Sequence, residues 1–423
     1  MDNPGIQTMG RFFHSIITIL LVFSLAGGCT RIPGNQVGEQ VAPLTPSREL
    51  HDSELLNVSI RIFDPGELPA DPDKRRGLAP EIRAAEARFA PIHLKHTLQR
   101  TGYWGAVRVV PDDDIGAELL VRGKIILSDG ESAVLQIEAV DARNRVWYRR
   151  TYAETARPEE YNNIEPEKED TFQDLFNSIT NDLIIFKNNL SEAEIAEIRN
   201  VALLNYARSM APDAFSGYLG ITREGYLFPL RLPAADDPML ARVNLVRSRD
   251  DMLIDTINDY YDIYYQDLWE PYTSWRRFRQ EEVTTLRKLE QEALAKQLLG
   301  VAAIAGAIVL GVATDSETSM RTQPLQQVMM AGGAYSLYSG YQTKQESKIN
   351  QDAIEELGIS FSSEAEPLVL DVEGKTIRLT GSAEQQYAAW RSMLRQIYAR
   401  ESGLIPLSEK PGAASPAPEN RQP

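Results

Sequence analysis

Cysteine is nearly missing from this sequence: its 423 residues contain one, Cys29. A lone thiol excludes an intramolecular disulfide and a zinc site built from several cysteines. Concentrated positive charge is missing as well, because no Lys/Arg-rich run occurs and the formal net charge is −16. Binding to a nucleic-acid backbone requires a concentrated basic face. We therefore expect no nucleic-acid partner for this chain.

Catalytic sequence motifs are also missing. The chain contains no GxSxG nucleophile elbow, no Walker loop and no dinucleotide-binding glycine fingerprint. His93 and His96 lie three residues apart and could share one helix face as metal ligands, but no HExxH-type companion accompanies them. We interpret them as a surface pair, and residues 112–114, which lack the spacing of an EF-hand loop, as a solvated turn. The sequence predicts no metal site, no cofactor and no enzyme activity.

The N-terminal segment explains the single cysteine. The apolar run at residues 16–26 is too short to span a bilayer comfortably but has the length of the central region of a signal peptide. The small residues after it complete the sequence LAGGC, which resembles the lipobox of bacterial lipoproteins, although Ala26 stands where leucine is commonest. This resemblance implies cleavage between Gly28 and Cys29 and a diacylglycerol on the Cys29 thiol. The alternative is an uncleaved N-terminal anchor.

The same resemblance indicates where the chain resides. Thr30 follows the cysteine, and lipoproteins without aspartate at that position usually reach the outer membrane, so we expect an outer-membrane lipoprotein facing the periplasm. Its partners would be membrane lipid, through acylated Cys29, and other envelope proteins. Met9 is the expected start, because the sequence MGRFF gives a signal peptide the short basic head that residues 1–8 do not provide.

The N-terminal half predicts an α+β domain at residues 51–156, after a lipidated flexible tether rich in proline and glycine at residues 29–50. Its elements are a strand at 58–62, a helix at 78–100 that Gly102 closes, and strands at 106–110, 117–127, 133–142 and 145–154. This order gives an antiparallel sheet with a packed helix. It loosely resembles small domains of envelope-assembly lipoproteins, the curli-secretion and polysaccharide-export accessory types.

A helical domain is expected at residues 171–350, after an acidic linker at 157–170. Apolar stripes predict helices over 172–184 and 195–206, and the sequence SEAE is a capping box that starts the second of them. Helical spacing then continues from Pro238 to about residue 313, with Pro271 expected to end or kink the helix. We assign the aromatic cluster within this helix to the core, with a membrane interface as the alternative.

A helical hairpin is predicted at residues 297–343, where two charge-free stretches lie on either side of the charged sequence DSETSMR. Its small-residue faces carry the glycines that permit close helix approach: Gly300, Gly306, Gly311, Gly332, Gly333 and Gly340. Three interpretations remain open: a buried helix pair, membrane insertion, and assembly of a homo-oligomer through the glycine faces. The chain should end in a β-hairpin plus helix module at 351–403, opened by a capping box at 382–385, and a disordered tail at 404–423.

Three functional hypotheses follow. The leading one is a non-enzymatic lipid-anchored scaffold or accessory subunit in envelope assembly or export, because an anchor and several small modules occur without a catalytic constellation. The second is an oligomeric pore or translocon component that inserts the hairpin at 297–343 into a membrane. The third is a periplasmic hydrolase using paired carboxylates dispersed along the sequence, which no motif reveals.

Overall fold

The computed structural model describes residues 34–38, 40–70, 78–156, 170–309, 349, 351–359, 368–372 and 375–401. The predicted lipidation site Cys29, the cleavage site at Gly28 and the tail at 404–423 lie outside these residues. So does most of the predicted hairpin, including Gly311, Gly332, Gly333 and Gly340, whereas Gly300 and Gly306 lie within the backbone of a described helix. Among the described helices, none combines the length and apolar character required to cross a membrane.

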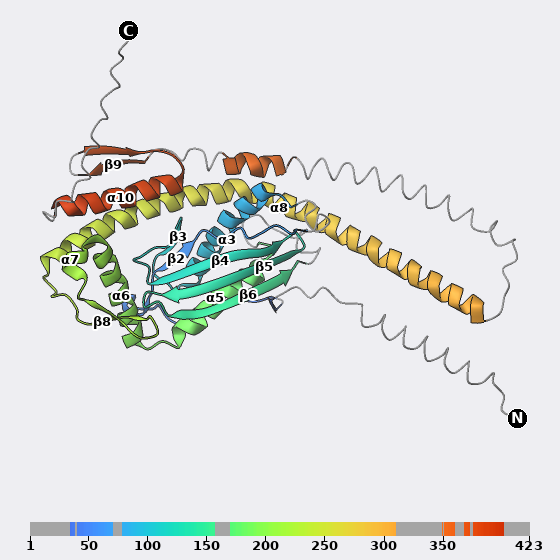
Figure 1. The fold of residues 1–423 in the computed structure, drawn as a ribbon, viewed down its shortest axis with the longest axis horizontal. Coiled ribbons are helices and arrows are strands. Elements are labelled where there is room, and N and C mark those ends of the chain that lie inside the picture. The colour runs from blue at the N-terminus through green and yellow to red at the C-terminus, as the bar shows by residue number, and fades with distance from the viewer. Residues whose placement is uncertain are drawn as a thin grey trace, which may run out of the picture.

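A six-stranded mixed sheet forms the centre of the molecule (Figure 1). Its order is β1-β6-β5-β4-β2-β3. The strands are β1 (Asn35–Gln36), β2 (Val58–Arg61), β3 (Val107–Val110), β4 (Leu119–Ser128), β5 (Ser132–Asp141) and β6 (Val146–Thr155). β4, β5 and β6 form the predicted antiparallel meander, with Gly130 (φ 89°) and Asn144 (φ 64°) supplying the left-handed turn residues. β2, in contrast, pairs in parallel with both β3 and β4.

Helices cover one face of this sheet and lie beside its β3 edge. They are α3 (Pro80–Thr101), α5 (Gln173–Asn188), α6 (Glu192–Met210), α7 (Pro212–Phe215), α8 (Pro238–Val309) and α10 (Ala383–Glu401), with a further helix at residues 351–359. Local signals set several ends, as predicted: Gly102 closes α3 in the left-handed conformation, and Ser191 and Glu194 form the capping box of α6. The smaller elements are the η1 turn (Asp52–Glu54) and the hairpins β7 (Leu219–Ile221)–β8 (Leu227–Pro229) and β9 (Leu368–Val372)–β10 (Lys375–Leu379).

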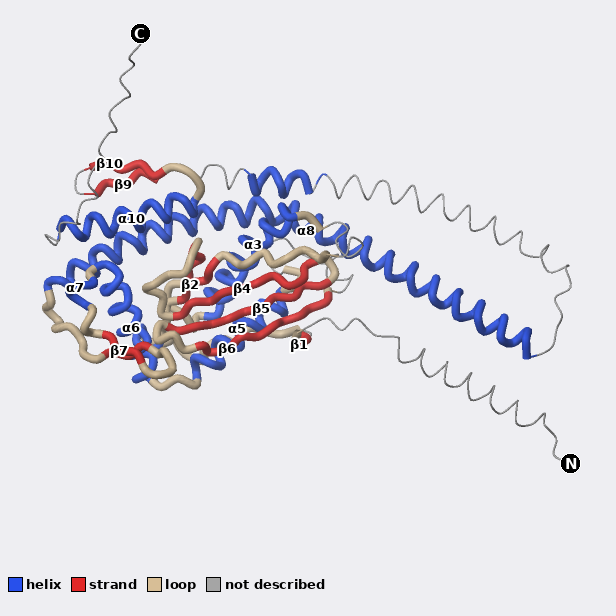
Figure 2. Tube along the Cα trace, viewed as in Figure 1, coloured by secondary structure: helices blue, strands red, loops and turns tan. Residues whose placement is uncertain are grey.

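Two connected cores hold these elements together. α3 and α5 cover one face of the sheet, burying Leu94, Ile137 and Leu183 in the first core. The second core joins α3, β3, α6, α8 and α10, and α8 crosses the molecule beside the β3 edge (Figure 2). The α+β class is confirmed. The domain boundaries expected at 157–170 and near 351 do not separate parts with independent hydrophobic cores. Helices α5, α8 and α10, which follow the first boundary, share their cores with elements of the N-terminal half.

The long helix α8 continues through Pro271, so of the two predicted outcomes, an end or a kink, the helix does not end here. Buried Leu268, Tyr272 and Trp275 flank the proline, and their packing compensates for the lost backbone hydrogen bond. Figure 1 shows α8 bent near the middle of its length. The aromatic stripe of this helix lies in the second core, which confirms the core assignment for Tyr261 and Tyr264.

The segment before the α+β domain is extended, as expected, but residues 35–44 are not a free tether. β1 pairs in parallel with β6. The backbone amides of Gln40 and Val41 donate to the Asp174 carboxylate at 2.8 Å each, and the Leu44 amide donates to Asn181 Oδ1 at 2.8 Å. The prediction of flexibility is therefore wrong here, because side chains of α5 satisfy the backbone groups that an isolated extended chain would leave to water.

Candidate functional site

A buried polar cluster lies where α3, the end of β4 and α8 meet. It comprises Arg83, Glu86, Ser128, Asp170, Tyr272 and Arg276, all of which are at most 6% exposed. Glu86 occupies the apolar face of α3, one turn from Phe89 and Ile82, and Arg276 occupies the aromatic face of α8, one turn after Tyr272. The sequence signal for this cluster is a charged residue within an apolar helix stripe, and none of its residues was predicted as a site.

Glu86 is the central acid of the cluster. Its Oε1 accepts hydrogen bonds from Ser128 Oγ at 2.5 Å and from Tyr272 Oη at 2.9 Å. Its Oε2 lies 3.5 Å from Arg83 Nη1, and both of these atoms are buried without a hydrogen-bond partner. Burial raises the pKa of Glu86, and the nearby Arg83 charge and the two hydroxyl donors offset only part of this effect.

Arg276 and Asp170 form a fully buried ion pair beside Glu86. Arg276 Nη1 donates to Asp170 Oδ1 at 3.0 Å and Nη2 donates to Oδ2 at 2.5 Å, a bidentate arrangement. Burial alone would raise the pKa of Asp170, but the Arg276 charge and hydrogen bonds outweigh burial and lower it. Asp170 also accepts from the Phe172 amide at 2.8 Å. The assignment of Asp170 to an acidic linker is therefore wrong, because this residue is buried and joins α8 to the start of α5.

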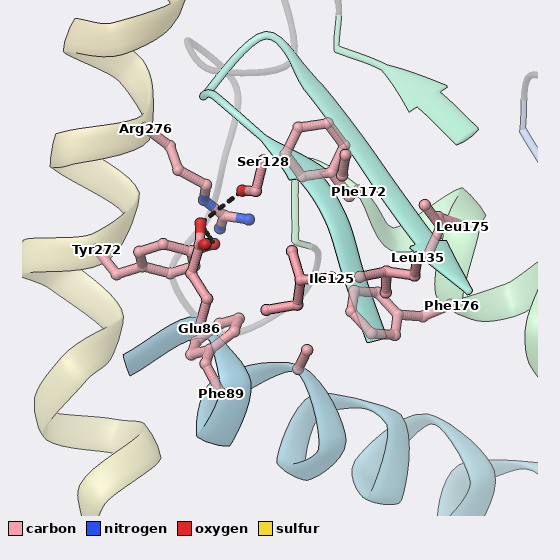
Figure 3. A pocket seen from close by; sticks show the side chains of 12 residues that line it. Glu86, Phe89, Ile125, Ser128, Leu135, Phe172, Leu175, Phe176, Tyr272 and Arg276 are labelled. Carbon is pink, nitrogen blue, oxygen red and sulfur yellow. Dashed lines mark hydrogen bonds between the residues drawn. The ribbon is translucent and has the colours of Figure 1, made fainter. Parts of the chain in front are cut away.

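A small cavity adjoins the cluster (Figure 3). Glu86, Ser128, Tyr272 and Arg276 line its polar end, and the side chains of the apolar end are those of Phe89, Ala90, Ile125, Ala133, Leu135, Phe172, Leu175 and Phe176. It encloses about 30 Å³. A single water needs about 10–15 Å³ by the same measure, so the cavity can hold one or two waters but no organic substrate or cofactor.

His93 and His96 bring α3 into contact with α5 and α8. His93 is 4% exposed, its Nε2 donates to Gln173 Oε1 at 3.0 Å, and its Nδ1 accepts from Tyr265 Oη at 2.7 Å. Burial lowers the pKa of His93 to about 4, so the ring is neutral near pH 7. The surface prediction is wrong for His93. His96 is half-buried, and its Nε2 lies 2.8 Å from Asp262 Oδ1, which also accepts from Lys95.

The aspartates after β3 form ion pairs and a hydrogen bond on the sheet face opposite α3 and α5. Asp113 pairs with Arg122 at 2.7 Å and with Arg61 at 3.3 Å, and Asp114 accepts from Ser59 Oγ at 3.0 Å. Within the described residues, no group of His, Cys, Asp or Glu is arranged to hold a metal ion. These aspartates therefore stabilise the turn and the sheet face.

The third hypothesis, paired-carboxylate hydrolysis, requires two facing acids in a substrate-sized pocket. The interior cavity holds one acid, Glu86. A groove of about 650 Å³ on the open sheet face holds Asp64 and Glu138. Lys124 pairs with Asp64, and Arg122 and Arg149 pair with Glu138. Neither of these two sites combines a free general acid with a nucleophile, so their geometry gives hydrolysis no support.

Comparisons with known proteins add no assignment. The chain matches no family model, no curated protein and no solved structure.

Proposed function

We propose that this chain is a non-enzymatic, lipid-anchored envelope protein that acts as a scaffold or accessory subunit in envelope assembly or export. In this proposal the thiol of Cys29 carries the lipid, the α+β body binds envelope partners, and the projecting end of α8 extends the reach of the body. The structural observation that supports the proposal best is the fixed attachment of a very long helix to a compact body.

The first half of α8 is attached through polar contacts as well as apolar ones. Arg276 contacts Asp170, as described above. Farther toward the start of α8, Asn258 Oδ1 accepts from the Val109 amide at 2.8 Å and its Nδ2 donates to the Val109 carbonyl at 2.9 Å. This side chain satisfies the free edge of β3, which would otherwise be open to pairing with another strand.

The second half of α8 extends beyond the body (Figure 1). We call residues 281–309 the helical arm; at about 1.5 Å per residue, the arm is roughly 40 Å long. β1, the first described strand, lies at the end of the sheet from which the arm departs (Figure 2). A lipid on Cys29, six residues before β1, would therefore attach near the base of the arm.

Two measurements test this proposal. Metabolic labelling with a palmitate analogue should label the wild type and leave the Cys29→Ala variant unlabelled, and only the wild type should resist release from washed membranes. A photocrosslinker in the helical arm, placed at Lys288, should capture envelope proteins, whereas one at Arg223 in the distant β7–β8 turn serves as the positional control. An unlabelled wild type, or a protein that stays monomeric and captures no envelope protein from the arm, would refute the proposal.

The pore alternative has one supporting observation, the continuation of α8 as a helix into the uncharged segment that begins at residue 297. Alkaline carbonate extraction of the Cys29→Ala variant separates the two functions. Complete release of this variant into the soluble fraction would support the scaffold function. Its retention in the membrane pellet would support the pore function.

A further inference from the structure

A third opening lies between α6, α8 and the start of β4. Its lining consists of Glu118, Ala196, Arg199, Asn200, Leu203 and Arg247, which we call the α6–α8 hollow, and its volume is about 400 Å³. This is more than ten times the volume of the cavity beside Glu86. The hollow is therefore large enough for a small molecule.

The two arginines of the hollow are held in place without using all of their donors. Arg199 Nη1 donates to the Asp52 carbonyl at 2.8 Å, and its Nε lies 3.9 Å from Glu118 Oε1. Arg247 Nη2 donates to the Gly116 carbonyl at 3.2 Å, and its Cζ lies 5.7 Å from the centre of the Tyr206 ring. Since a guanidinium has five N–H donors, each arginine has donors left for a ligand.

The charges of the hollow do not balance. Glu118 is its single acid, with a side chain 7% exposed that accepts from the Asn57 amide at 2.8 Å. Burial raises the pKa of Glu118, and the charges of Arg199 and Arg247 offset part of this effect. Arg247 makes no ion pair within 4.0 Å in the part of the chain that the structure describes, although its charge acts on the carboxyl groups of Glu118 and Asp251.

We propose that the α6–α8 hollow binds a small oxyanion, a phosphate or carboxylate carried by a small molecule. Arg199 and Arg247 donate to the anion, and their planar forks match the geometry of two-oxygen acceptors. Asn200 supplies an amide donor, and Leu203 forms an apolar wall for the rest of the ligand. The Gly116 carbonyl and the Tyr206 ring orient Arg247 before the ligand arrives, which reduces the entropy lost on binding. This site is independent of the proposed scaffold function.

The test is titration calorimetry of the full chain in detergent micelles, with inorganic phosphate and acetate as separate probes at constant ionic strength. We expect saturable binding of at least one probe in the millimolar range or tighter. Arg199→Gln and Arg247→Gln should each weaken it about tenfold or more, because a hydrogen bond to a charged group contributes about 1.5–3 kcal/mol and each 1.4 kcal/mol is about tenfold. Arg277→Gln, an exposed arginine of the same helix, is the matched control.

The outcomes distinguish the ligand class from failure of the proposal. Binding of phosphate alone assigns a tetrahedral oxyanion, and binding of acetate alone assigns a carboxylate. The Glu118→Gln variant should bind the same probe more tightly, because it removes the one negative charge of the hollow. Absence of binding by both probes, or binding that both arginine substitutions leave unchanged, would overturn the proposal.

Discussion

The buried neutral imidazole of His93 makes a specific prediction about acid stability. The pKa of His93 is about 4 in the folded protein, against about 6.5 for an exposed histidine. The unfolded chain therefore takes up the proton first as the pH falls. The contribution of His93 to folding stability is complete above about pH 6.5 and is lost progressively as the pH falls toward 4.

The magnitude follows from the two pKa values. Between pH 7 and about pH 5 the linkage relation gives a loss of about 2 kcal/mol from this residue alone. His93→Gln cannot take up the proton, so the free-energy difference between wild type and variant should shift by about 2 kcal/mol in favour of the variant over this range. Urea unfolding at both pH values measures the shift, with the exposed His51→Gln as control. Equal pH dependence of the wild type and the His93 variant would refute the argument.

Three further predictions concern the attachment of α8. Arg276→Met should lower the free energy of unfolding by about 3–5 kcal/mol, because Asp170 is left buried and unpaired, and adding Asp170→Asn should restore part of the loss in a double-mutant cycle. Asn258→Ala should cost about 1–3 kcal/mol and speed hydrogen exchange at the Val109 amide, whereas unchanged exchange would contradict the edge-capping role. The Glu86→Gln variant should gain stability relative to wild type as the pH rises from about 5 to 8. The reason is that the raised pKa of Glu86 makes its contribution to the free energy of unfolding greatest at low pH. A difference in unfolding free energy that stays constant over this range would disprove the raised pKa.

Much of the fold could be predicted because its signals are local. The β4–β6 meander follows from three closely spaced strand-forming runs and from turns in which Gly130 and Asn144 adopt positive φ. The start of α6 follows from the Ser191–Glu194 capping box. These features depend on residues close together in the sequence, so one segment contains all the information that they require.

The remaining features depend on distant partners. β1 is two residues long and forms only because β6 and α5 lie beside it. Asp170 looks like part of a charged linker until Arg276, more than one hundred residues later, is placed against it. The same reasoning applies to the candidate sites. The cluster could have been suspected from Glu86, a charge on an apolar helix face, but the α6–α8 hollow has no sequence signal because it joins α6, α8 and β4.

The polar contacts along α8 explain why such a long helix keeps one position on the body. An apolar face alone tolerates a shift by one turn, about 5.4 Å, with only a modest penalty in packing. Arg108, Val109 and Asp170 on the body bind specific side chains at three levels of α8, including Asp255 at 2.6 Å from Arg108 Nε. Sliding the helix by one turn would break all three interactions and leave the buried groups unpaired, which costs far more than the accompanying change in apolar packing. Because the register of the first half is fixed in this way, the direction of the helical arm is fixed as well. The proposed scaffold function, in which partners are held at a set distance, requires that property.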